Sequence, residues 1–170
     1  MADPGQLPGK QPVSALLAGP YGHPFHPVLV TLPIGAWVSS VVLDVGARVT
    51  DHTAALTFGA TWLLGIGLVG AVLAAAVGFL DFLGIPTGTP AHRLALWHMS
   101  VNLVATALFL VALLLRLDQP DRTNTGAFVL AVLGLVGIGV SGVLGGELTF
   151  RYGVRVAAET DQVHGLSPRD

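Results

Sequence analysis

The stretch that decides the fold reads YGHPFHPVLVTLPIG and spans residues 21–35. In it, His23 and His26 are each followed by proline, where a polar tail gives way to a long apolar run. Histidine is costly to place at a membrane boundary without a partner, and its neutral imidazole is a common ligand of metal ions and haem. The stretch therefore predicts the start of a membrane-spanning helix and a candidate binding site at one membrane face.

The composition of the whole chain is that of a membrane protein. Of its 170 residues, 52% are hydrophobic and 11% are charged, and the mean hydropathy is +0.72. A soluble domain carries about 25% charged residues, so most of this surface is expected to face lipid. The net charge of -2 gives no electrostatic basis for binding nucleic acid. The absence of cysteine excludes disulfides, thiolate metal sites, Fe–S clusters and covalently attached c-type haem within the chain.

Four apolar runs predict an all-α integral membrane four-helix bundle. The predicted spans are residues 28–47, 56–80, 92–115 and 126–146. Each has about 20 residues, the length that crosses a hydrocarbon layer of ~30 Å. Pro27 suits the first turn of a helix, whereas Pro33 cannot donate to the carbonyl of Leu29 and predicts a kink near that level.

The four spans lie in a predicted transmembrane domain, residues 23–155, between two tails. We expect residues 1–22 to form a flexible tail without a cleavable signal peptide and residues 156–170 to form a polar tail. Four spans place both tails on one side, called side A, together with the connector 82–91. The turns 49–53 and 116–125 then lie on side B.

Positive charges favour side A as the cytoplasmic side of the membrane, although the excess is small. Side A has Lys10, Arg93, Arg151, Arg155 and Arg169, and side B has Arg48, Arg116 and Arg122.

The two halves of the chain show signs of an internal repeat. The sequence GLVG at residues 67–70 recurs at residues 134–137, and each half begins with histidines and ends with an acid. A two-plus-two parallel repeat would place both sets of polar residues at the same membrane face. Chance similarity between Ala-, Val-, Leu- and Gly-rich segments is the alternative.

Small residues also form two stripes that predict close helix packing. They are Gly67, Gly70, Ala74 and Gly78, and Gly134, Gly137, Ser141 and Gly145.

The polar residues that can carry chemistry gather on side A. They are His23, His26, Asp81, His92, His98 and Glu147. His98 lies inside the third span, and Asn102 follows it by one helical turn on the same face. We expect His26 and His98 to face the bundle interior, with Asp81 or Glu147 within hydrogen-bond or shared-ligand distance of one of them.

Two kinds of cofactor fit these residues. His26 and His98 can hold haem b axially, with His23 and Asn102 beside it and the glycines leaving room for the flat macrocycle. Alternatively, His26 and His98 can bind Fe, Cu or Zn with oxygen from Asp81 or Glu147, or those carboxylates can orient the imidazoles.

Each residue also has a purely structural interpretation. His23 and His92 can be hydrated interface residues, His26 can cap the first helix, and His98 can bond to a facing helix. On side B, Asp44 and Arg48 stand four residues apart and predict an interfacial ion pair.

The chain resembles a bacterial family of four-span membrane proteins catalogued as domain of unknown function 2231. The resemblance rests on HPxLVxxPIG at residues 26–35, Asp44, GFLD at residues 78–81, Arg93 before His98 and Asn102, and GGELTFRYGV at residues 145–154. It covers nearly all of the chain after the N-terminal tail. Many relatives have a second histidine just before Pro33, where this chain has Thr31 and Leu32. Some relatives are fused to Rieske-type or cytochrome-type domains, which implies redox work at the membrane.

Three functions follow as hypotheses. The first is a haem- or metal-binding redox subunit in the lipid bilayer that passes electrons to a partner protein. The second is a structural membrane protein without a cofactor. The third is a small proton-linked transporter that uses His98, Asp81 and Glu147 as a relay. No nucleophile-elbow, phosphate-loop or metalloprotease motif appears, so a hydrolase is not expected. Whether the chain forms a homo-oligomer is left open.

Overall fold

The fold of the chain is a bundle of four long helices, seen in a computed structural model that describes residue 7, residues 9–14 and residues 24–166. The elements are α1 (Phe25–Leu29), α2 (Thr31–Val49), α3 (Thr53–Leu83), α4 (Pro90–Leu114), α5 (Thr125–Gly146), the π-helical turn η3 (Glu147–Arg151) and α6 (Glu159–Leu166). No strand occurs in the residues that the structure describes. The predicted all-α class is therefore confirmed.

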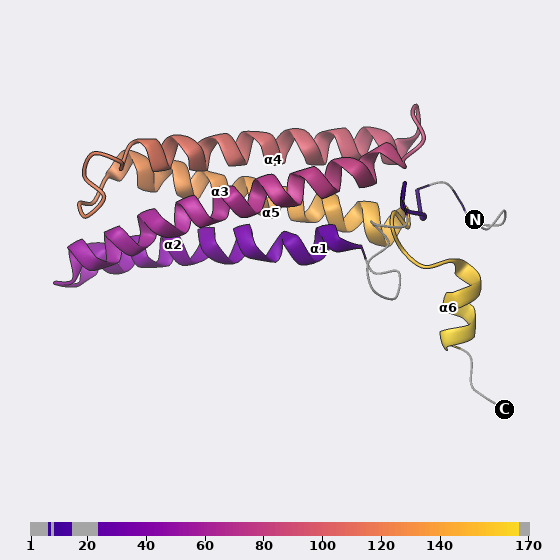
Figure 1. The fold of residues 1–170 in the computed structure, drawn as a ribbon, viewed down its shortest axis with the longest axis horizontal. Coiled ribbons are helices and arrows are strands. Elements are labelled where there is room, and N and C mark those ends of the chain that lie inside the picture. Colours follow the sequence, from indigo (N-terminus) through magenta and orange to yellow (C-terminus); the bar gives the residue numbers. More distant parts are fainter. Residues whose placement is uncertain (1–6, 8, 15–23, 167–170) are drawn as a thin grey trace.

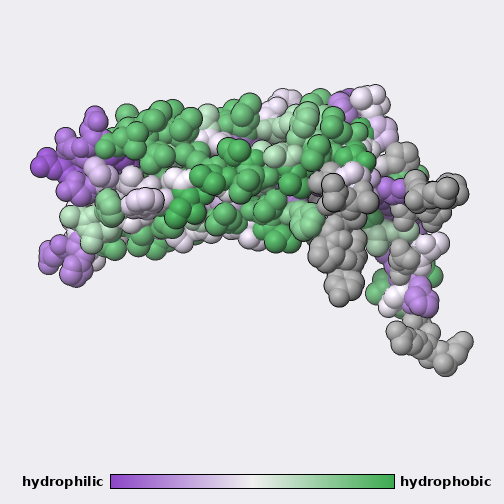
Figure 2. Space-filling model, viewed as in Figure 1, coloured by the Kyte–Doolittle hydropathy of each residue, from purple (hydrophilic) through white to green (hydrophobic). Residues whose placement is uncertain are grey.

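Four helical segments are long and apolar enough to cross a membrane: Phe25–Val49, Thr53–Leu83, Pro90–Leu114 and Thr125–Arg151, with 25 to 31 residues each. Their outer faces carry large apolar side chains that are exposed in the described part of the chain, including Val72, Leu103 and Val136. Figure 2 shows this apolar surface extending along the bundle, with hydrophilic residues gathered at its ends. Water would not tolerate such a surface on a monomer, so the bundle is an integral membrane protein whose faces contact lipid.

The helices form two hairpins, α2 with α3 and α4 with α5, and each hairpin packs along its whole length. The hairpins meet where α3 contacts α4 and where α2 contacts α5. Residues 9–14 and α6 both lie at the end of the bundle where α1 begins (Figure 1). This end is side A, so the described parts of the two tails lie on one side, as predicted.

Local sequence signals explain where the helices begin and break. The first span is interrupted at Val30, between α1 and α2, because Pro33 cannot donate to the carbonyl of Leu29. Val30 keeps right-handed helical angles (φ -66, ψ -18), and the bend at this level stays a prediction. The side chain of Thr89 caps α4 by accepting a bond from His92 N, and Pro90 follows at the first helical position. The prediction that residues 1–22 form a flexible tail lies largely outside the described residues.

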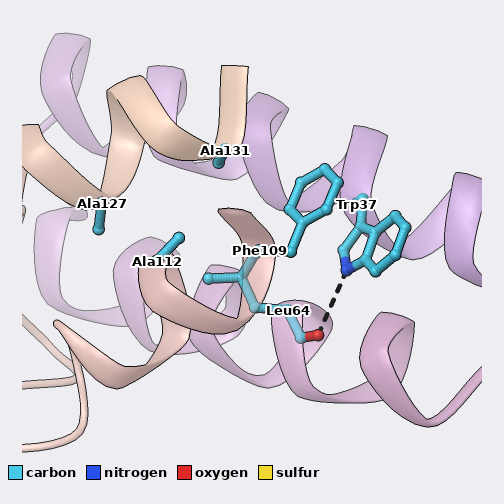
Figure 3. Packing of buried hydrophobic residues seen from close by; sticks show 6 residues of the cluster. All are labelled: Trp37, Leu64, Phe109, Ala112, Ala127 and Ala131. Atoms are coloured by element: carbon cyan, nitrogen blue, oxygen red, sulfur yellow. Dashed lines mark hydrogen bonds between the residues drawn. The ribbon is translucent and has the colours of Figure 1, made fainter. Parts of the chain in front are cut away.

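The centre of the bundle is filled by aromatic rings and small residues. Trp37 stacks on Phe109 with ring centroids 3.9 Å apart and an angle of 11° between the planes. The Trp37 indole Nε1 donates to Leu64 O at 3.4 Å (Figure 3). Ala127 and Ala131 of α5 are fully buried beside these rings. Their small side chains let α5 approach the aromatic pair closely.

Each glycine stripe packs against the partner helix of its own hairpin. A Cβ atom at Gly67 would clash with the Trp37 ring, and one at Gly134 would lie 2.7 Å from Phe109 Cε2. Further toward side A along the same stripes, Gly70 packs against Leu32 and Pro33, and Gly137 packs against Ala105. The predicted close packing is confirmed, and each glycine makes room for a side chain that faces it.

These contacts repeat between the two hairpins at constant spacings. His98, Phe109 and Arg116 follow their counterparts His26, Trp37 and Asp44 by 72 positions, and Gly134 and Gly145 follow Gly67 and Gly78 by 67 positions. In addition, each of the three counterpart pairs meets across the bundle centre. The correspondence matches a two-plus-two parallel repeat about an axis along the bundle.

The predicted ion pair of Asp44 with Arg48 is present, but Asp44 has a second and closer arginine partner in Arg116. Arg116 donates from Nη1 to Asp44 Oδ1 at 2.8 Å and from Nη2 to Oδ2, and both side chains are 0% exposed. Arg116 follows the end of α4 at Leu114 and lies in the loop as expected, but its side chain turns back into the bundle and is buried. Arg48 lies 3.8 Å from Asp44 Oδ1, donates to Asp44 O, and lies over the Phe128 ring. A buried carboxylate needs a buried cation, which Arg48, a quarter exposed, does not supply.

Candidate functional site

Two histidines from different helices meet at side A. His26 of α1 and His98 of α4 have ring centroids 6.4 Å apart, with the ring planes at 82°. The internal repeat explains this meeting, because the two residues occupy corresponding positions on facing helices. The structure therefore brings together the two residues that the sequence singled out as ligands.

The hydrogen bond of His26 determines which ring nitrogen carries the proton. His26 Nδ1 lies 2.9 Å from Ala74 O of α3. A backbone carbonyl only accepts, so Nδ1 must carry the proton and donate it. The lone pair of the neutral ring is then on Nε2, the nitrogen that binds metals.

His98 is held from three sides. Its Nδ1 lies 2.9 Å from Ser141 O, so this nitrogen also donates to a carbonyl, and the Ser141 hydroxyl lies 3.0 Å from the same atom. Its Nε2 must then accept, and Asn102 Nδ2 donates to it at 3.1 Å. The same Asn102 amide also donates to His98 O at 3.0 Å. Asn102 therefore bonds to both the ring and the backbone of His98.

Two glycines make room for the imidazoles themselves. A Cβ atom at Gly78 would lie 2.8 Å from His26 Cε1, and one at Gly145 would lie 3.1 Å from His98 Cε1. The sequence predicts that these glycines leave room for a flat macrocycle. In the structure, the space above Gly78 and Gly145 is taken by the histidine rings, which the glycines allow to lie against α3 and α5.

Asp81 lies near the pair but bonds elsewhere. Its carboxylate forms an ion pair with Arg155, with Oδ1 2.9 Å from Nε, and both side chains are largely buried. Among the described residues, no hydrogen bond joins Asp81 to His26 or His98, whose Nδ1 atoms bond to backbone carbonyls instead.

The other predicted site residues lie outside this group. Glu147 pairs with Arg151 at 3.3 Å, and both side chains are exposed. The ring of His92 packs against Phe82, with centroids 5.0 Å apart. His23 lies outside the described residues. In the part of the chain that the structure covers, no group of three or more His, Asp or Glu residues is arranged to hold a metal ion.

The tails cover the side A end of the bundle through contacts that the sequence analysis missed. Arg155 N donates to Gly9 O at 3.0 Å, and Arg155 has a left-handed backbone with φ 58. Lys10 Nζ lies 2.6 Å from Glu159 Oε1, and this hydrogen bond lowers the pKa of the Glu159 carboxyl. Lys10 and Glu159 stand 149 positions apart, so no local pattern could pair them.

The donor set restricts the cofactors that fit. Two imidazole nitrogens that each bind one metal ion at about 2 Å hold their ring centroids roughly 6 Å apart, and the rings of His26 and His98 are 6.4 Å apart. Zinc sites need three or four protein ligands, whereas haem iron needs from the protein only its axial ligands. The described residues offer two imidazoles at this distance and no third His, Asp or Glu arranged with them to hold a metal ion.

The fold and site define a class: a four-span integral membrane protein with a histidine pair between its two hairpins at one membrane face. The chain belongs to the family described as "Predicted membrane protein (DUF2231)", whose match covers residues 22–158. The matched region includes all four spans, both histidines of the pair and Arg155. No curated protein and no solved structure matches the chain.

Proposed function

We propose that the chain is a membrane-embedded redox subunit in which His26 and His98 are the axial ligands of a haem b iron. The observation that carries the proposal is the convergence of two imidazoles whose Nδ1 atoms both donate to backbone carbonyls. This bond fixes the tautomer and leaves Nε2 as the metal-binding atom of each ring. Bound haem iron would supply one-electron exchange, with a redox protein as the partner.

The surroundings of the pair suit this role. The rings lie near the side A face, where a partner protein in water can approach. The Asp81–Arg155 ion pair and the segments 9–14 and 152–158 lie between the bundle and that water. The membrane-facing surface of the helices is apolar and keeps water away laterally. We propose that side A faces the cytoplasm of a bacterium and that the spans lie in its inner membrane. The orientation rests on positive charge, which is slightly more frequent on side A than on side B.

A visible absorption spectrum of the purified protein tests the proposal. The wild-type chain in nanodiscs is expected to show a Soret band, with α and β bands after reduction by dithionite. His26→Ala is expected to lose the bound haem, because one of two axial ligands is removed. His52→Ala is the matched control, because His52 is an exposed residue of the side B turn.

The same preparation decides between the alternatives. Elemental analysis of the haem-free protein would detect Fe, Cu or Zn bound without a porphyrin. Protein that carries neither haem nor metal, and that takes up no haemin when this is added, would contradict the proposal.

A structural role is the second candidate, and it is favoured by the fit of each imidazole over a glycine. In that role the histidines fasten α1 to α3 and α4 to α5 through Nδ1. His26→Ala and His98→Ala would then lower the thermal stability of a protein that has no visible absorbance.

A further inference from the structure

The two histidines correspond in the repeat, but their neighbours differ. The position that corresponds to Ser141 holds Ala74, and the position that corresponds to Asn102 holds Val30. His98 consequently has a hydroxyl beside Nδ1 and an amide on Nε2, whereas His26 has only the carbonyl of Ala74. Among the described residues, none forms a hydrogen bond with His26 Nε2. The repeat thus places two corresponding imidazoles on facing helices. The different residues at two neighbouring positions give these imidazoles different hydrogen bonds.

We propose that Asn102 is a positioning residue that makes His98 the exchangeable ligand of the centre and leaves His26 as the permanent one. A small neutral ligand of iron, such as carbon monoxide, would then bind in place of His98. This inference rests on the proposed function and deepens it, because it adds ligand binding to electron transfer at the same site.

The hydrogen bonds give the physical reason. His98 Nε2 can bind a metal only after it gives up the bond from Asn102 Nδ2, because both use the same lone pair. Asn102 is well placed to compete, because its amide is anchored by a second bond to His98 O. One net hydrogen bond shifts an equilibrium by roughly two- to tenfold. His26 Nε2 has no such competitor on Val30, so its bond to a metal carries no comparable cost.

The test compares Asn102→Val with a matched control. Valine is the residue at the corresponding position of the first hairpin, so the substitution copies the surroundings of His26. Thr106→Val is the control, since it removes a polar group from the same face of α4 one turn later, outside the site. All variants are reconstituted in nanodiscs, checked for helix content and monodispersity, loaded with haemin, reduced with dithionite and titrated with carbon monoxide.

We expect carbon monoxide to bind the wild type by displacing His98. Asn102→Val should bind carbon monoxide about two- to tenfold more weakly, since His98 then competes better for the iron. His98→Ala should bind it more tightly than the wild type, and Thr106→Val should equal the wild type. Equal affinities of wild type and Asn102→Val would overturn the inference, as would loss of haem by His98→Ala together with its retention by His26→Ala.

A second measurement needs no haem. Nitrogen-15 NMR of histidine-labelled protein reports which ring nitrogen carries the proton and whether the other accepts a bond. The His98 Nε2 signal should shift in Asn102→Val and stay in place in Thr106→Val. An unchanged signal in Asn102→Val would contradict the Asn102 contact.

Failure of the wild type to take up haemin removes the proposed function and the inference together. Normal uptake with unchanged carbon monoxide affinity removes the inference alone.

Discussion

At the scale of single residues, polar side chains in this bundle come in pairs that cross from one hairpin to the other. His26 meets His98 near side A, and Asp44 meets Arg116 near side B. A lone charge inside a membrane bundle costs several kcal/mol, so each buried charge is placed where its counterpart in the repeat can reach it. These polar contacts therefore fix the position of one hairpin relative to the other. Apolar packing alone would leave that position free.

The buried ion pair gives a prediction about stability. Asp44→Leu leaves the Arg116 guanidinium buried without its partner and should lower the free energy of unfolding by about 3–5 kcal/mol. The double variant Asp44→Leu, Arg116→Leu removes both charges and should cost less than either single change. Chemical unfolding in detergent micelles measures these differences.

An exposed pair in the same chain is the control. Glu147→Ala should change the unfolding free energy by about 0–1 kcal/mol, because the pair with Arg151 is open to solvent. A double variant that is less stable than both single variants would refute the assignment of Asp44 and Arg116 as mutual partners.

At the scale of helices, glycine position decides how closely each hairpin packs. Gly67 faces the Trp37 ring, whereas a Cβ atom at Gly139 of α5 has no heavy atom within 4 Å. The two glycines thus have opposite roles within similar apolar helices. Packing against Trp37 requires glycine at position 67, whereas position 139 has room for a side chain.

Alanine at these two positions should change stability in opposite directions. Gly67→Ala forces Trp37 away from Phe109 and should cost about 1–3 kcal/mol. Gly139→Ala has free space and should be neutral or stabilise by up to about 1 kcal/mol through helix propensity. Thermal denaturation in detergent compares the two variants, and equal melting temperatures would show that Gly67 does not set the packing.

At the scale of the whole molecule, the topology can be tested by introducing single cysteines, because the chain has no native cysteine that would also be labelled. Single cysteines at the exposed positions Ser14 and Thr160 report side A, and cysteines at Asp51 and Asp118 report side B. In intact bacterial cells, a membrane-impermeant maleimide should label only the side B positions. Permeabilised cells should show labelling at all four.

Each labelling outcome has one meaning. Labelling of Ser14→Cys and Thr160→Cys in intact cells, with side B protected, would invert the proposed orientation and leave the four-span fold intact. Labelling of only one of these two in intact cells would contradict the four-span fold itself.

Much of this organisation follows from the sequence alone. Hydropathy and length determine the four spans, because a lipid environment requires continuous apolar helices with internally bonded backbones. An even number of spans places both tails on side A. Pro33 determines the break at Val30, since it lacks an N–H in any environment. The histidines at the start of each half, His23 and His26 and then His92 and His98, predicted that the site lies on side A.

The tertiary structure decided which side chains are partners. Asp44 has Arg48 one turn away and Arg116 72 positions away, and the sequence favours the near residue. The bundle favours the distant one, because Arg116 enters the interior while Arg48 stays at its edge. The register within each hairpin likewise directs His26 Nδ1 to Ala74 O and His98 Nδ1 to Ser141 O. Local sequence sets the depth and face of a side chain, but its partner depends on how separate helices slide and rotate against each other, which only packing fixes.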